Sequence, residues 1–328
     1  MGNCLWTLKK SKAEIAPSEL IKSPPVIKLY GPPNSFATSH IRLAIRYKPV
    51  TLQFVPSDTD LNPTLIYQSD VVSGSVEDIL RYLDAKFPDP PLSFTNNTAG
   101  SIWGWCGGTT PLVVSVVVMQ HRSLNWHLER MVKWSEDMAA RGGNSKEDPS
   151  MGSPRMEVKK FGRSYSQLLQ VMLEHAQMEE TVLFQILETA DRGLCKSANE
   201  EHARHLPIMN GIREDIKAIG VMNAGSPDYQ EALVNLTSRL KTLKENCGKH
   251  FEEEERELLP LMEATELNKP QQEKILQQSL DVMSETHSQL FRFFMEGLQP
   301  QDAMHYFDLI KRYCDNVRVS LMLHMMVE

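Results

Sequence analysis

A histidine followed four positions later by a glutamate occurs twice inside an apolar helical stripe of this chain, as His175 with Glu179 and as His250 with Glu254. Positions i and i+4 lie on one face of an α-helix, so each pair extends an apolar seam, which regular spacing continues through Val182 and Ile186 and through Leu258 and Leu261. A carboxylate on the core side of a helix is costly unless a cation or hydrogen bonds compensate it. Two such pairs predict a shared cation.

Two further predicted helices place histidine on their apolar stripe. His121 takes an apolar position within 111–138, and His202 and His205 share one face within 197–220. Four helices would then each direct a histidine inward. Imidazole and carboxylate together suit iron, manganese or zinc, and helix bundles hold di-metal sites between inward-facing side chains of these types.

The segment from about Pro111 to Met262 resembles the hemerythrin-like, HHE cation-binding family. The resemblance rests on the seam around His121, the two His-x-x-x-Glu pairs, the Glu201–His202 step, and Leu259–Pro260 after the second pair. It implies an up-down four-helix bundle that holds two non-haem iron ions and binds dioxygen. Carried over to this chain, it implies His121, His175, His202 and His250 as terminal iron ligands, and Glu179 and Glu254 as bridges.

Some positions depart from the oxygen-carrying hemerythrins, which have His-x-x-x-His on the third helix and His-x-x-x-x-Asp on the fourth. This chain has His202-x-x-His205 and the His250–Glu254 pair there, so the resemblance does not require oxygen carriage. His205 stays open as a further ligand, because Pro207 can kink the helix and redirect both rings.

Other histidines lie outside these two His-x-x-x-Glu seams. His127 falls off the apolar stripe, and we expect it to pack or to face solvent rather than bind metal. We expect structural roles for His287, His305 and His324.

Composition limits the classes of function. The net charge of −7, without a basic face, argues against generic nucleic-acid binding. The five cysteines are odd in number and form no Cys-x-x-Cys pair, which indicates a reducing compartment such as the cytoplasm and no disulfide framework. No apolar stretch reaches the roughly 18 residues of a membrane span.

The first third of the chain alternates strand and helix patterns, in the order strand, helix, strand, strand with a turn, helix. This order is typical of a thioredoxin-like half-domain, and LYGPPNSFATSHIRLAIRYK and ILRYLDAKFP resemble the N-terminal domain of glutathione transferases. Asn34 and Ser35 stand where that family has its catalytic side chain, and Ser75 and Val76 replace its Glu-Ser pair. Pro63 is the candidate for its cis-proline. We expect a domain for binding or docking rather than for thiol transfer.

The amino terminus, MGNCLWTLKKSK, resembles an N-myristoylation site at Gly2 with a palmitoylation cysteine at Cys4 and lysines nearby. Trp6 departs from the motif, which prefers Ser or Thr there. Two interpretations stay open, an acylated anchor at the cytoplasmic face of a membrane and an unstructured basic tail.

Together these patterns predict an α+β multidomain protein, mostly α. The expected parts are a tail over 1–25, the thioredoxin-like domain over 26–95, a linker over 96–110, the bundle over 111–265, and C-terminal helices over 266–328 packed on the bundle, the first running from Lys269 through Gly297. The leading hypothesis is a non-haem iron-binding protein that senses or handles iron, oxygen or peroxide at a membrane surface, rather than an enzyme. The alternatives are an adaptor without a functional metal and a glutathione-dependent transferase. The sequence names no protein partner.

Overall fold

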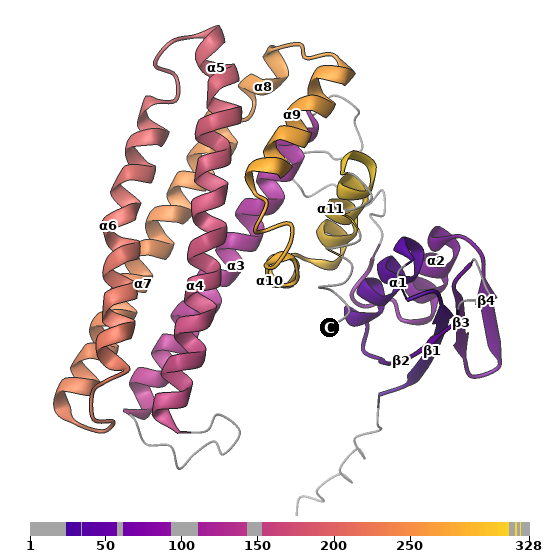
Figure 1. The fold of residues 1–328 in the computed structure, drawn as a ribbon, viewed down its shortest axis with the longest axis horizontal. Coiled ribbons are helices and arrows are strands. Elements are labelled where there is room, and N and C mark those ends of the chain that lie inside the picture. Colours follow the sequence, from indigo (N-terminus) through magenta and orange to yellow (C-terminus); the bar gives the residue numbers. More distant parts are fainter. Residues whose placement is uncertain are drawn as a thin grey trace, which may run out of the picture.

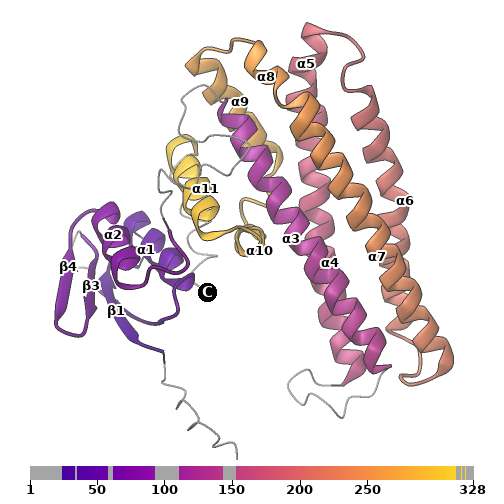
Figure 2. The same ribbon diagram turned by 180° about the vertical axis from the view of Figure 1, so that it is seen from behind.

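Four long helices lie side by side in the computed structural model, which describes residues 24–33, 35–57, 62–92, 111–142, 153–314, 319 and 322 (Figure 1). They are α3 (Leu112–Arg141), α4 (Pro154–Met178), α6 (Lys196–Ile219) and α7 (Pro227–Glu253). A small α/β domain lies on the side of the bundle away from α6 and α7, as the reverse view also shows (Figure 2). The predicted fold class is therefore confirmed: a small α/β domain, a helical bundle and extra C-terminal helices.

Local sequence signals set the ends of the bundle helices. Ser153 and Ser226 are the N-caps of α4 and α7; each hydroxyl oxygen accepts a hydrogen bond from a backbone N–H three residues later, and each is followed by a proline. Gly142 ends α3 with a φ of 56°, a left-handed conformation that glycine adopts readily. Helix α6 continues through Pro207.

A π-helical turn interrupts the seam of α4 and of α7 directly at the paired glutamate. These turns are η1 (Glu179–Leu183), followed by α5 (Phe184–Ala190), and η2 (Glu254–Leu258), followed by α8 (Leu261–Ala264). Within and beyond them the buried residues are Leu183, Phe184 and Leu187, and Leu259 and Met262. Val182, Ile186 and Leu258 of the expected seam are only partly buried against the core, and Leu261 is 38% exposed, because a π turn takes up one extra residue and shifts the buried face.

The C-terminal segment forms α9 (Lys269–Val282), α10 (Phe291–Glu296) and α11 (Pro300–Tyr313). The expected single helix from Lys269 to Gly297 was wrong, and Glu174 of α4 supplies the reason. Its buried carboxylate accepts hydrogen bonds from the backbone N–H groups of Glu285, at 3.0 Å, and of Thr286, at 2.8 Å, and from the Thr286 hydroxyl at 2.6 Å. These bonds hold the chain in a non-helical path against the bundle.

The N-terminal domain contains a four-stranded sheet in the order β2-β1-β3-β4. Strands β1 (Val26–Gly31) and β2 (Thr51–Pro56) are parallel and joined through α1 (Phe36–Arg46); β3 (Thr64–Tyr67) and β4 (Asp70–Ser73) are antiparallel additions before α2 (Val76–Lys86). The predicted order of strand, helix, strand, strand and helix is present, with β4 as one strand more than expected. The cis peptide bond among the described residues is Asp89–Pro90, so the interpretation of Pro63 as a cis-proline was wrong.

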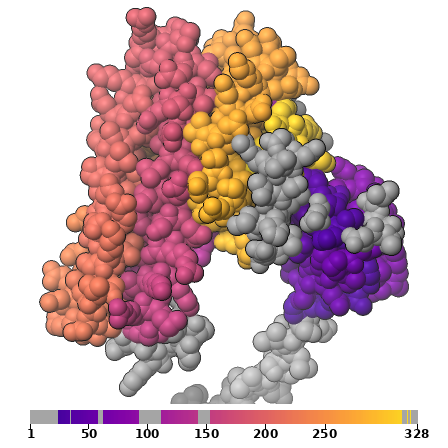
Figure 3. All heavy atoms as spheres, viewed as in Figure 1, coloured from indigo at the N-terminus to yellow at the C-terminus, as the bar shows by residue number. Residues whose placement is uncertain are grey.

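The N-terminal domain packs on the C-terminal helices, which lie between it and the bundle (Figure 3). Phe36 of α1 stacks on Phe307 of α11 with ring centroids 4.6 Å apart. The Tyr47 hydroxyl donates a hydrogen bond to the carbonyl of Met295, at 3.0 Å. None of the helices in the described part of the chain is both long enough and apolar enough to cross a membrane.

Candidate metal centre

The four bundle helices bring all six predicted ligand side chains into one buried cluster. Helix α3 supplies one histidine, α6 a second, and α4 and α7 each supply a histidine with the glutamate that opens the following π turn. Their fractional exposure does not exceed the 8% of His202. The members are His121, His175, Glu179, His202, His250 and Glu254.

Glu179 lies between two pairs of histidines. Its Oε1 is 3.4 Å from Nε2 of His121 and 3.2 Å from Nε2 of His175. Its Oε2 is 3.4 Å from Nε2 of His202. One carboxylate therefore turns one oxygen toward the His121/His175 pair and the other oxygen toward the His202/His250 pair.

Glu254 spans the same two pairs from the opposite helix. Its Oε2 is 3.4 Å from Nε2 of His121, and its Oε1 is 3.4 Å from Nε2 of His250. The two Nε2 atoms of His202 and His250 lie 2.9 Å apart. We call the two ends of the cluster the His121/His175 position and the His202/His250 position.

The donor atoms are close enough together to surround cations. The ligand atoms of Glu179, His202, His250 and Glu254 all lie within 4.8 Å of one another, and so do those of His121, His175 and Glu179. Four buried polar atoms of the cluster make no hydrogen bond; they are Nε2 of His175, Oε2 of Glu179, and both carboxylate oxygens of Glu254. Since buried polar atoms are nearly always satisfied, this donor set fits metal ions.

The outer nitrogen of every cluster histidine bonds a side chain from a neighbouring helix. The Nδ1 atoms of His121 and His202 lie 2.9 Å from carboxylate oxygens of Glu255 and Glu180, respectively. His175 pairs with the Gln120 amide oxygen at 2.9 Å, and His250 with the Glu201 carboxylate at 2.8 Å. An Nδ1–H that donates to such a partner leaves Nε2 free to bind metal, which is the usual arrangement around metal-ligating histidines.

Sequence reasoning did not assign these outer partners, although their positions follow a repeat. Glu180 and Glu255 directly follow the paired glutamates, whereas Gln120 and Glu201 directly precede His121 and His202. The chain thus repeats His-x-x-x-Glu-Glu on α4 and α7, with a Gln-His or Glu-His step on α3 and α6. The α3 and α6 steps supply the outer partners of the histidines on α4 and α7, and the glutamates that follow the pairs on α4 and α7 supply those of the histidines on α6 and α3. The cluster therefore has approximate two-fold symmetry.

Burial and the carboxylates act in opposite directions on the histidines. Burial lowers the pKa of His175 to about 3. Burial also opposes protonation of His202, but the Glu179 carboxylate at 3.4 Å and the hydrogen bond to Glu180 outweigh it and raise its pKa to about 9. Burial and the nearby charge of Glu179 raise the pKa of Glu254. A cation that binds here takes the place of protons that the carboxylates otherwise hold on imidazole.

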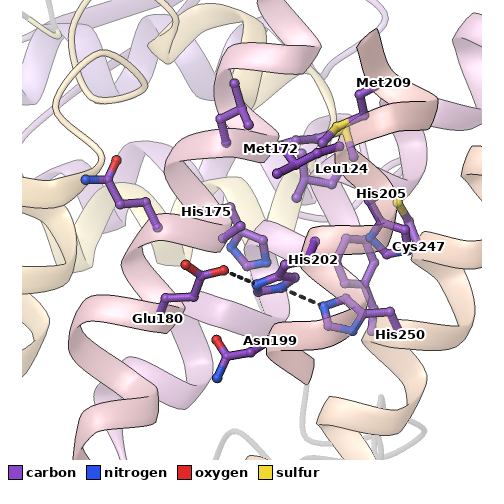
Figure 4. A pocket seen from close by; sticks show the side chains of 16 residues that line it. Leu124, Met172, His175, Glu180, Asn199, His202, His205, Met209, Cys247 and His250 are labelled. Atoms are coloured by element: carbon purple, nitrogen blue, oxygen red, sulfur yellow. Dashed lines mark hydrogen bonds and ion pairs between the residues drawn. The ribbon is translucent and has the colours of Figure 1, made fainter. Parts of the chain in front are cut away.

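A cavity of about 400 Å³ opens beside the cluster and is lined by three of its histidines together with apolar side chains such as Met172 and Met209 (Figure 4). His205 lines this cavity, with its ring centroid 5.6 Å from that of His250. Burial lowers the pKa of His205 to about 4. The structure therefore brings His202 into the cluster and leaves His205 at the cavity wall.

The other histidines have different surroundings. His127 is buried, as a packing residue: its Nε2 is 2.8 Å from the carbonyl oxygen of Phe293, and the two rings stack with centroids 3.8 Å apart. His287 bonds the Met283 carbonyl oxygen and the Tyr306 hydroxyl, both at 2.7 Å. The predicted lipidation residues Gly2 and Cys4 lie outside the described residues, as does His324.

A family model described as the hemerythrin HHE cation binding domain matches residues 112–262. The matched span begins with α3 and includes all six residues of the cluster. The match and the buried cluster together support a metal-binding role for the bundle. No family model matches the N-terminal α/β domain. No curated protein matches the chain.

Proposed function

We propose that the bundle binds two non-haem iron ions and that the protein senses or handles iron, oxygen or peroxide. His121 and His175 would hold one ion, His202 and His250 the other, and Glu179 and Glu254 would bridge them. The observation that carries this assignment is the direction of the two carboxylates, each with one oxygen toward each histidine pair. Mixed imidazole and carboxylate donors suit iron.

The surrounding residues support this role in three ways. The outer partners fix the four imidazole rings with Nε2 directed inward. The buried apolar seams exclude bulk water from the donors. The cavity beside His202 and His250 gives a small molecule access to the cluster. When bound, an iron pair supplies reversible one-electron chemistry and affinity for oxygen species.

We place this function at the cytoplasmic face of a membrane, through acylation of Gly2 and Cys4. Gly2 follows Met1, Cys4 offers a second acylation site, and Lys9, Lys10 and Lys12 add positive charge. A single myristoyl chain binds membranes only weakly, so stable attachment needs a second acyl chain or a basic patch, and this segment offers a cysteine for the first and lysines for the second.

Metal analysis of the purified full chain tests the proposal. We expect about two iron ions per chain from the two histidine pairs, and an optical spectrum that changes on anaerobic reduction. Iron contents near zero after reconstitution with Fe²⁺ would refute the proposal and favour the adaptor hypothesis, in which the bundle only presents interaction surfaces.

The transferase hypothesis is the weaker alternative. The start of α1, where glutathione transferases have their catalytic side chain, packs through Phe36 on Phe307 of α11. We therefore expect no retention of the chain on immobilised glutathione. Specific elution by free glutathione would reverse this ranking.

A further inference from the structure

The two ends of the cluster differ in the charge of their outer partners. At the His202/His250 position both outer partners are carboxylates, Glu180 and Glu201. At the His121/His175 position one partner is the Glu255 carboxylate, but the other is the neutral amide of Gln120. The approximate two-fold repeat is therefore broken at one pair of equivalent residues, Gln120 and Glu201.

The Gln120 side chain is fixed with its amide oxygen toward His175. It is fully buried, and its amide nitrogen lies 3.0 Å from the sulfur of Met283 and 3.5 Å from the Tyr306 hydroxyl. Both of these neighbours accept a hydrogen bond from an N–H group. The C-terminal segment thus orients a neutral amide, rather than a carboxylate, toward His175.

This difference changes how strongly each histidine binds a cation. A carboxylate that accepts the Nδ1–H bond makes Nε2 a more basic ligand than a neutral amide does, and such outer partners typically change metal affinity by about 10- to 100-fold. The additional negative charge near His250 also attracts a cation directly. Both effects favour the His202/His250 position.

Access favours the same position. Both His202 and His250 line the cavity beside the cluster, whereas only His175 of the other position does. His121 is 1% exposed, and its ring stacks on Phe251 with centroids 4.3 Å apart. An ion in the cavity therefore contacts both histidines of the His202/His250 position but only one histidine of the His121/His175 position.

We propose that the two metal positions are unequal, and that the His202/His250 position fills first and binds its ion more tightly. The difference between Glu201 in one half of the cluster and Gln120 at the equivalent place in the other half sets this order. Glu201 acts as a positioning residue through His250. This inference rests on the proposed two-metal function.

Zn²⁺ titration of the full chain against a chromophoric chelator tests the order without depending on redox activity. We expect two binding steps separated by about 10-fold or more. Glu201→Gln should weaken the tighter step by about 10-fold and leave the weaker step within about 2-fold of the parent. The matched control is Glu200→Gln, which changes an exposed glutamate one position earlier on α6 and should leave both steps unchanged.

Several results would overturn the inference. Two indistinguishable steps in the parent would mean that the positions are equal. If Glu201→Gln weakens only the weaker step, the order is reversed. If Glu201→Gln weakens both Zn²⁺-binding steps to the same extent, or weakens neither step, Glu201 does not distinguish the two positions. Failure of the parent to bind any Zn²⁺ or iron would instead refute the proposed function, and the inference with it.

Discussion

Replacing Glu254 by glutamine should act in opposite directions on the metal-free and metal-loaded protein. The side chain is 3% exposed, and both of its oxygens lack a hydrogen bond within the protein. Burial and the charge of Glu179 raise its pKa above the usual 4.5. A carboxyl group whose pKa is higher in the folded than in the unfolded chain destabilises the fold when ionised at pH 7. Glu254→Gln should therefore leave the free energy of unfolding of the metal-free chain unchanged or raise it.

The metal-loaded protein should lose most of its metal-dependent stability, because Glu254 faces both His121 and His250. A ligand present at about 1,000 times its Kd stabilises a fold by ~4.1 kcal/mol. Loss of a direct ligand should weaken binding by at least about 100-fold, beyond the usual effect of an outer partner. At the same ligand concentration the stabilisation then falls to ~1.4 kcal/mol, a loss of ~2.7 kcal/mol per ion.

Denaturant unfolding with and without metal measures both effects. Glu253→Gln is the matched control, because it changes an exposed glutamate one position earlier on the same helix and should behave like the parent. A Glu254→Gln variant that is destabilised equally with and without metal would show that this glutamate is a structural core residue. An unchanged metal-dependent increment would refute its assignment as a bridge.

Three further predictions concern single residues. His202→Ala should lower the metal content per chain more than His205→Ala does, because His202 lies in the cluster and His205 lines the cavity. An equal loss of metal from the two variants would mean that both histidines are ligands. Burial lowers the pKa of His127 to about 4. The unfolded chain, with a histidine pKa near 6.5, then takes up the proton first, so this residue's contribution of up to ~3 kcal/mol is present above pH 6.5 and is lost as the pH falls toward 4. His127→Gln should flatten that part of the stability profile, and a parallel profile would contradict the assignment. Gly2→Ala, with a carboxy-terminal fluorescent tag, should move the protein from membranes to the cytosol; unchanged distribution would exclude the anchor.

The sequence determined which side chains meet in the bundle. His175 with Glu179 and His250 with Glu254 lie at i and i+4 within apolar seams, and a helix with such a seam has one way to bury it. His121 and His202 interrupt similar seams. These regularities are local, so the inward-facing histidines and glutamates and the helical fold could be predicted from spacing, and the resemblance to the HHE family selected the set of six.

Spacing could not reveal where the helices leave regular geometry. The π turns at Glu179 and Glu254 shift the buried face to Leu183 and Leu259, because the bundle positions these glutamates against histidines of other helices. Likewise, the segment after Val282 leaves the helix because Glu174 binds its backbone N–H groups.

The resemblance to the HHE family favoured His202 over His205, and the tertiary structure places His202 in the cluster and His205 at the cavity wall. Only the tertiary structure assigned the outer partners. Both histidines face inward on α6, but Nε2 of His202 lies 2.9 Å from Nε2 of His250 and 3.4 Å from Oε2 of Glu179. Gln120 and Glu201 are ordinary polar residues in the sequence, and each acquires its role from a histidine far away in the chain. Helical periodicity fixes the face of a side chain, whereas contacts between distant helices fix its partner.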